Sequence, residues 1–236
     1  MVQVVCEWGL SGIEAWRSRA TAFVIVDVLS FSTAVSVALD QGAEVIPFPW
    51  GDQTAAEQAA REQGAVAATP RRTGGSQLSL SPASLRTLKA DARLLLPSPN
   101  GSRLSLATGA VPTFCGSFRN FAAVAAAVCT ASPAGTIVVI AAGERWPDQT
   151  MRPAIEDWPG AGAIIKALSC SENSEARLAR ISYEVAEAEL VGMVRDSISG
   201  RELIDRGFGE DVEIALEVGS SSSVPQLIDG RYQRSA

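Results

Sequence analysis

Short apolar segments rich in β-branched residues alternate with segments of helical periodicity along most of the chain, and this alternation restricts the folds open to it. The strand-like segments are FVIVDVL (23–29), EVIPFPW (44–50), RLLLPSP (93–99), VPTFCGS (111–117) and TIVVIAAGE (136–144). Strands separated by helices form a mainly parallel sheet with helices on both faces. No linker-like stretch divides the sequence. The pattern predicts one α/β domain over residues 1–236, with three α/β/α layers and a mainly parallel or mixed central sheet.

Several predicted helices carry end signals. The helix after the first strand-like segment should stop at Gly42, and the next should begin at the N-cap Asp52 and end at Gly64. Toward the C-terminus the pattern predicts a helix over 174–194, a short helix over 199–209, a final strand over 212–218 and a loop or tail over 220–232. Two longer irregular stretches, 69–81 and 143–158, are expected to be functional loops.

The composition removes several classes of function. The chain has no histidine, which excludes Ser-His-Asp and Cys-His catalysis and histidine-ligated metals. Its four cysteines form no CxxC pair, so we expect reduced, mostly buried thiols. A net charge of −6 argues against nucleic acid or an anionic membrane as a partner. Without a signal peptide or an apolar span, the chain is expected to be cytoplasmic.

Acidic residues follow several strand-like segments, where ligands of open α/β sheets bind. Asp27 ends one apolar segment, Glu144 ends another, and Glu156 and Asp157 lie further along the second loop. Carboxylates gathered at one rim suit Mg²⁺, so all four are candidate metal ligands, with Asp27, Glu144 and Asp157 also candidate catalytic groups. The alternatives are a structural Asp27 that accepts helix N–H bonds, a solvated Glu144, and an acidic pair that complements a helix dipole.

Small, hydroxyl and basic residues follow the same segments and could hold an anion at helix starts. The candidate substrate-binding residues are Ser30, Ser32, Thr33, Asn100, Gly101, Ser102, Arg103, Ser117, Asn120 and Arg145, with Arg119 as a further cation. Ordinary N-capping and solvated arginines are the alternatives. Carboxylates beside an anion site would repel phosphate unless a divalent ion lay between them, so the set points to Mg²⁺-dependent phosphoryl transfer.

The order of motifs over about 23–225 resembles the 2-phosphosulfolactate phosphatase family. The motifs are VDVLSFSTAVSVAL, GAEVIPF, GGSQLSLSPASL, LLLPSPNGSR, FCGSFRNFAAVA, VVIAAGE, IEDWPGAGAII and SGRELIDRGFGEDV. The resemblance implies Mg²⁺-dependent hydrolysis of 2-phospho-3-sulfolactate to 3-sulfolactate and phosphate, a step toward coenzyme M where that is made. It places Asp27, Asn100-Gly101, Asn120, Glu144 and Glu156-Asp157 in the family's motifs.

One position departs from the family pattern. Ser30 stands where the family usually has arginine after Asp-Val-Leu, so we expect a weaker hold on a substrate that carries phosphate, sulfonate and carboxylate. The first hypothesis is a phosphatase of a small acidic phosphoester, by direct water attack or through an aspartyl-phosphate on Asp27. A non-catalytic binder of a phosphorylated or sulfonated metabolite and a protein-interaction scaffold are the alternatives. A homodimer is compatible with each.

Overall fold

The computed structural model describes residues 2–70 and 77–234, and within them the chain forms strands and helices in alternation. The strands are β1 (Val2–Trp8), β2 (Ala20–Val26), β3 (Glu44–Pro49), β4 (Val66–Ala67), β5 (Arg93–Ser98), β6 (Thr113–Gly116), β7 (Gly135–Ala141), β8 (Glu144–Arg145), β9 (Met151–Arg152), β10 (Ser171–Glu172), β11 (Pro225–Ile228) and β12 (Arg231–Arg234). The helices are α1 (Gly9–Trp16), α2 (Phe31–Asp40), α3 (Gln53–Glu62), α4 (Pro82–Leu85), α5 (Gly101–Ala107), α6 (Phe121–Ala131), α7 (Asp157–Leu168), α8 (Ser174–Ala186), α9 (Leu190–Asp196), α10 (Ile198–Asp205) and α11 (Gly209–Ala215).

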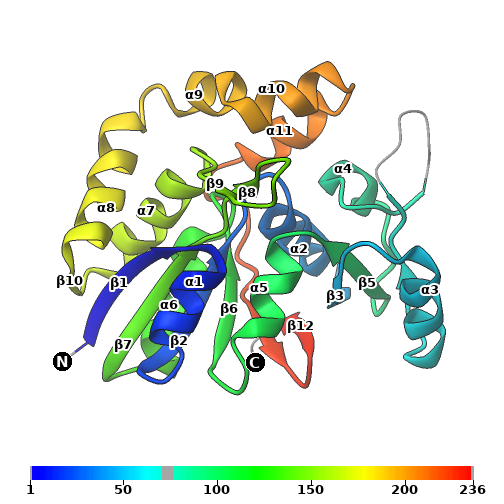
Figure 1. The fold of residues 1–236 in the computed structure, drawn as a ribbon, viewed down its shortest axis with the longest axis horizontal. Coiled ribbons are helices and arrows are strands. Elements are labelled where there is room, and N and C mark those ends of the chain that lie inside the picture. Colours follow the sequence, from blue (N-terminus) through cyan, green and yellow to red (C-terminus); the bar gives the residue numbers. More distant parts are fainter. Residues whose placement is uncertain (1, 71–76, 235–236) are drawn as a thin grey trace.

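Ten of the described strands form one mixed sheet in the order β10-β1-β7-β2-β6-β11-β12-β3-β5-β4 (Figure 1). One group, β10, β1, β7, β2 and β6, pairs in parallel, and a second group, β3, β5 and β4, also pairs in parallel. The antiparallel hairpin β11–β12 lies between the groups, joined to β6 by Gln226 opposite Phe114 and to β3 by Tyr232 opposite Val45. The mixed sheet confirms the predicted fold class.

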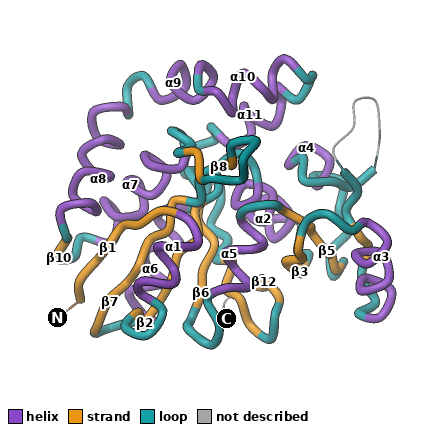
Figure 2. The backbone as a smooth tube through the Cα atoms, in the orientation of Figure 1, coloured by secondary structure: helices purple, strands orange, loops and turns teal. Residues whose placement is uncertain are grey.

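Helices cover both faces of the first group, as Figure 2 shows for the strands in orange and the helices in purple. Alternate residues of β2 point to opposite faces, so Val24 and Val26 join the core under α6, α7 and α8, while Phe23 and Ile25 join the core under α1 and α5. A third core packs α2 and α4 against β3, β5 and β12. These layers bring the ends of β2, β6 and β7 together at one rim.

The predicted helix ends are found where the local sequence supports them. Asp52 caps α3 by accepting the Ala55 N–H at 2.8 Å, and Gly64 follows that helix at a positive φ of 61°. Gly42, at φ 82°, follows α2 in the same way. These signals are local, which is why the sequence predicts them well.

Three predictions near the C-terminus are wrong. The segment 212–218 is not a strand but mostly lies in α11, whose first turn carries Glu210 and Asp211 and complements the helix dipole. The segment 220–232 is not only a loop, because it contains β11 and the start of β12. The region 174–194 is two helices, since α8 ends at Ala186 and α9 starts at Leu190.

The N-terminal segment also forms elements that the sequence analysis left unassigned. Strand β1 pairs with β7 over its whole length, and α1 follows it directly at Gly9. Of the two irregular stretches, 143–158 contains the small hairpin β8–β9, while residues 71–76 of the other lie outside the described part of the chain. Within the described residues, no helix is both long and apolar enough to cross a lipid bilayer.

Candidate active site

The turn Asn100-Gly101 holds two carboxylates from different strands of the sheet. Gly101 donates its backbone N–H to Asp27 Oδ2 at 2.8 Å, and Asn100 Nδ2 donates to Glu144 Oε2 at 2.8 Å. Asp27 follows β2 and Glu144 opens the hairpin after β7, so these two come from neighbouring parallel strands. Asn100 follows β5, in the second parallel group. One turn therefore links the two groups at their acidic residues.

Asp27 is almost fully buried and accepts two backbone N–H bonds, from Gly101 and from Phe31 at 3.2 Å. Its own N–H donates to Ser32 Oγ at 2.9 Å, which fixes the loop between β2 and α2. Burial and then the charge of Glu144 raise the pKa of Asp27 to about 7, against the opposing effect of the two N–H bonds. Two ionised carboxylates are costly to bury side by side, and a cation near Asp27 and Glu144 would offset that cost.

Asp157, like Asp27, accepts one backbone N–H on each of its oxygens, and the two donors belong to different loops. Oδ1 accepts the Val28 N–H at 2.7 Å, and Oδ2 accepts the Gly143 N–H at 2.9 Å. Burial, followed by the charges of Glu156 and Asp27, raises the pKa of Asp157 well above its usual value. The carboxyl group of Asp157 therefore ties the loop after β2 to the loop after β7, which positions Asp27 and Glu144 relative to each other.

Glu156 adds another buried carboxylate, one oxygen of which accepts no hydrogen bond from the described residues. Its side chain is 2% exposed, and Oε2 has no hydrogen-bond partner among the described residues. Burial raises the pKa of Glu156, while the hydroxyl of Ser199 lowers it. Glu156 also contributes to the raised pKa values of Asp27 and Glu144. An unpartnered buried oxygen in an acidic neighbourhood is a position where a cation or its water ligand would be stabilised.

The donor set fits Mg²⁺ as an ion shared with substrate rather than enclosed by protein. In the described part of the chain, no group of three or more acidic or cysteine side chains is arranged to hold a metal ion. Mg²⁺ in phosphoryl-transfer sites is commonly held by one or two carboxylates, waters and substrate oxygens. Asp27 and Glu144 can supply such a pair, with the open oxygen of Glu156 nearby. The role of these residues as metal ligands stays a prediction.

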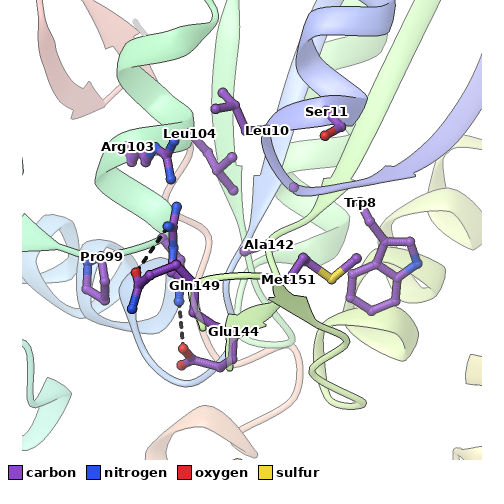
Figure 3. A pocket seen from close by; sticks show the side chains of 13 residues that line it. Trp8, Leu10, Ser11, Pro99, Arg103, Leu104, Ala142, Glu144, Gln149 and Met151 are labelled. Atoms are coloured by element: carbon purple, nitrogen blue, oxygen red, sulfur yellow. Dashed lines mark hydrogen bonds between the residues drawn. The ribbon is translucent and has the colours of Figure 1, made fainter. Parts of the chain in front are cut away.

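A cleft of about 290 Å³ opens beside Glu144 (Figure 3), whereas the buried Asp27 is not among the residues that line it. Asn100 and Glu144 line one part of it, and Arg103 and Arg145 bring positive charge. No carboxylate among the described residues forms an ion pair with either arginine. Arg145 instead donates to Gln149 Oε1 at 3.4 Å, across the tip of the β8–β9 hairpin. Both arginines thus line the cleft, and their binding of a substrate anion stays a prediction.

Two further segments line the cleft: one that the sequence analysis does not assign to a site, and one within 143–158, expected to be a functional loop, whose cleft residues Gln149 and Met151 it does not name. The first is the junction of β1 and α1, where Trp8, Gly9, Leu10 and Ser11 form one wall. The second is the β8–β9 hairpin, which adds Gln149 and Met151, with Met151 next to Trp8 (Figure 3). Strand-like alternation in VQVVCEW could have indicated the first segment, whereas nothing in the sequence marks Gln149 as a cleft residue.

The hydroxyl side chains predicted for the substrate are buried and bonded within the protein. The Ser32, Thr33 and Ser102 hydroxyls donate to the main-chain carbonyls of Ile25, Val28 and Leu96, at 3.1, 2.8 and 2.7 Å. Ser117 and Asn120 bond to each other, and Asn120 also donates to Ser223 O at 3.2 Å. Ser30 is 3% exposed and precedes α2. In this structure these side chains fix the loops that carry Asp27 and Asn100, and their contact with substrate stays a prediction.

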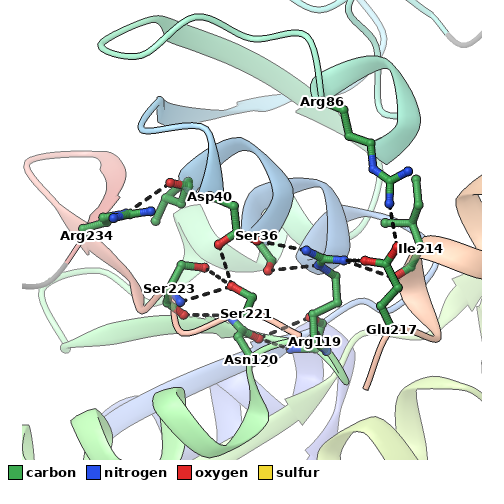
Figure 4. Close-up of polar contacts among 12 residues, drawn as sticks. Ser36, Asp40, Arg86, Arg119, Asn120, Ile214, Glu217, Ser221, Ser223 and Arg234 are labelled. Carbon is green, nitrogen blue, oxygen red and sulfur yellow. Dashed lines mark hydrogen bonds and ion pairs between the residues drawn. The ribbon is translucent and has the colours of Figure 1, made fainter. Parts of the chain in front are cut away.

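Arg119 lies in a separate polar cluster (Figure 4). It is 6% exposed and forms ion pairs with Asp40, at 2.9 Å, and with Glu217. Its Nε also donates to Ser36 Oγ at 3.4 Å. The guanidinium therefore joins α2 to the segment after α11, and it is not among the residues that line the cleft.

Comparisons with known proteins agree on one family. The family model described as 2-phosphosulpholactate phosphatase matches residues 12–230. The 2-phosphosulfolactate phosphatase of Methanothermobacter thermautotrophicus is 30% identical over 215 residues, which cover 89% of this chain and 88% of that protein. Probable 2-phosphosulfolactate phosphatases of Carboxydothermus hydrogenoformans and Thermotoga petrophila are 29% and 26% identical, with 89% of this chain covered in each case and 88% and 90% of the relatives.

Proposed function

The chain belongs to the 2-phosphosulfolactate phosphatase family, and from this premise we propose that it hydrolyses 2-phospho-3-sulfolactate or a related small acidic phosphate monoester, with Mg²⁺, in the cleft that Glu144 lines. The observation that supports this most directly is the Asn100-Gly101 turn, which bonds to both carboxylates at the edge of a cleft that contains Arg103 and Arg145. Acidic and basic groups that meet in this way suit a phosphate bound together with a divalent cation.

In this proposal each group has a defined task. Asp27 and Glu144 would hold the ion, which when bound polarises the phosphoryl oxygens and lowers the pKa of a bound water. Arg103 and Arg145 would bind the phosphate through charge-assisted hydrogen bonds. Asn100 keeps the Glu144 carboxylate in place, and Asp157 keeps the two loops in register. Glu156, whose buried Oε2 has no hydrogen-bond partner among the described residues, would accept a proton from the attacking water, although it does not itself line the cleft.

A panel of phosphate monoesters assayed with and without Mg²⁺ tests the proposal. We expect Mg²⁺-dependent release of phosphate from phosphosulfolactate and its simpler analogues, and loss of turnover in Asp27→Asn and Glu144→Gln. Arg103→Gln and Arg145→Gln should each raise KM about tenfold or more, because a charge-assisted contact contributes about 1.5–3 kcal/mol. Arg177→Gln is the matched control, since Arg177 is exposed on α8 and away from the cleft.

The same panel separates hydrolysis from simple binding. If the wild-type protein binds the phosphoesters but releases no phosphate with any divalent ion, the chain is a binding protein and the proposed hydrolysis is wrong. If turnover proceeds unchanged in chelator, the assignment of Asp27 and Glu144 to an ion is wrong. Full activity in both carboxylate variants would show that the reaction takes place elsewhere on the molecule.

A further inference from the structure

A second hollow of about 560 Å³ adjoins the cleft and shares five of its lining residues. The shared residues are Leu10, Pro99, Arg103, Arg145 and Gln149. Both arginines therefore lie at the boundary between the two hollows. A phosphate bound by these arginines would have Glu144 on one side and the second hollow on the other.

The second hollow has a mostly apolar wall built from separate parts of the fold. Trp50 directly follows β3, Leu106 lies on α5, and Leu10 lies in the first turn of α1. Arg103 and Leu106 are three residues apart on one helix, so they share a face of α5. Among the described residues that line this hollow, Arg103 and Arg145 are the only charged side chains. Its surroundings thus combine positive charge at one end with apolar surface along the rest.

Two of these apolar side chains are unusually open to solvent for their size. Trp50 is 51% exposed and Leu106 is 47% exposed, and both line the same hollow. Large apolar side chains that face a concave surface beside an anion site commonly contact a ligand, because burying them against it removes apolar surface from water. A three-carbon acid such as phosphosulfolactate carries no apolar group to cover them.

We propose that this hollow, lined by Trp50, Leu106 and Leu10, is a subsite for an apolar alkyl or aryl group of an amphipathic phosphate monoester, whose phosphate is bound by Arg103 and Arg145. The inference rests on the proposed function and extends it to a substrate class. The phosphate enters the cleft next to Glu144, and the organic group lies over Trp50. The substrate that fits this chain best therefore has a larger and less acidic organic part than phosphosulfolactate.

Calorimetric titration with methyl-, butyl- and hexylphosphonate tests the subsite, because the carbon–phosphorus bond of these probes resists phosphatase hydrolysis. We expect Kd to fall about two- to fourfold for each added methylene up to butyl in the wild-type protein. Trp50→Ala should remove most of this chain-length dependence while changing the Kd of methylphosphonate less than twofold. Trp146→Ala is the matched control, since Trp146 is 46% exposed but lines neither hollow.

Two results would overturn the subsite. One is an equal Kd for all three phosphonates in the wild-type protein, and the other is an undiminished chain-length dependence in Trp50→Ala. Both are independent of catalysis. If the protein binds hexylphosphonate tightly through Trp50 but hydrolyses no phosphate monoester, the proposed subsite stands and the proposed phosphatase activity is wrong. If the protein hydrolyses small acidic phosphoesters but binds all three phosphonates with the same Kd, the proposed activity stands and the proposed subsite is wrong.

Discussion

The substitution Gly101→Ala should disable the protein although it adds a single methyl group. A Cβ atom at Gly101 would lie 2.6 Å from Phe31 Cβ and closer still to the ring, far inside van der Waals contact. Phe31 is fully buried at the start of α2 and cannot turn away. The start of α5 must therefore move, and the Gly101 N–H then leaves Asp27 Oδ2.

The cost can be estimated from these two changes. Overpacking in a core costs about 1–3 kcal/mol, and loss of a hydrogen bond to a charged group costs about 1.5–3 kcal/mol. The sum of about 2.5–6 kcal/mol corresponds to a fall in Tm of roughly 5–20 °C for a chain of this size. Because Asn100 moves with Gly101, its bond to Glu144 weakens, and kcat/KM should fall at least tenfold.

Thermal denaturation and steady-state kinetics of two variants check this reasoning. The control is Gly192→Ala, on the exposed side of α9, where an added Cβ meets nothing within 4 Å. That change should raise stability by about 0.5–1 kcal/mol through helix propensity and leave the kinetics unchanged. If Gly101→Ala is as stable and active as the wild type, the close packing of α5 on Phe31 does not set the geometry of the site.

Three further variants test separate parts of the structure. A raised pKa means that folded Asp27 holds its proton more tightly than the unfolded chain does, so its contribution to stability is present below about pH 4 and is lost as pH rises through about 7. As pH rises from about 4 to about 7, Asp27→Asn should therefore become more stable relative to the wild type, by up to about 4 kcal/mol in Mg²⁺-free urea titrations. A stability difference between the two proteins that does not change with pH would contradict this. Asp157→Ala should lower stability by about 2–6 kcal/mol with or without Mg²⁺, because the Val28 and Gly143 N–H groups lose their acceptor, and an unchanged Tm would remove its role in tying the loops. Arg119→Gln should lower stability by about 1.5–3 kcal/mol, because Asp40 loses its ion pair with Arg119 and Glu217 keeps only the one with Arg86. KM for phosphoesters should stay within twofold, and a large rise in KM would place Arg119 back among the substrate ligands.

The fold class and the rim could be predicted because the signals are local and periodic. The apolar runs that became β2, β6 and β7 are short, β-branched and followed by helices, so the positions of Asp27 and Glu144 at one rim follow from parallel pairing. Asn100 belongs to a different parallel group, and its bond to Glu144 depends on packing of α5 that no local pattern encodes. The same holds for Trp8 and Gln149 in the cleft.

The C-terminal hairpin and helix are marked by turn residues and helical spacing rather than by composition. The hairpin β11–β12 turns at Asp229 and Gly230, both at positive φ, and an Asp-Gly pair between two apolar segments is a strong hairpin signal. The run 212–218 alternates in hydrophobicity like a strand, but it overlaps α11, whose buried positions, Asp211, Val212, Ile214 and Ala215, follow helical spacing. The roles of Ser32, Thr33 and Ser102 were ambiguous from the sequence because a hydroxyl at a helix start serves equally well to cap a loop or to bind an anion.

The position of the β11–β12 hairpin has a consequence for the order in which the molecule can assemble. Every other strand of the sheet precedes it in the chain, yet it occupies the centre and is what connects the two parallel groups. A ribosome therefore completes both groups before the strands that join them exist. Until then β6 and β3 each present an open edge, to which a neighbouring nascent chain could add a strand. Tyr232 is fully buried and its hydroxyl is 2.7 Å from that of Ser105, so its burial would hold the hairpin in place and end the exposure of these edges.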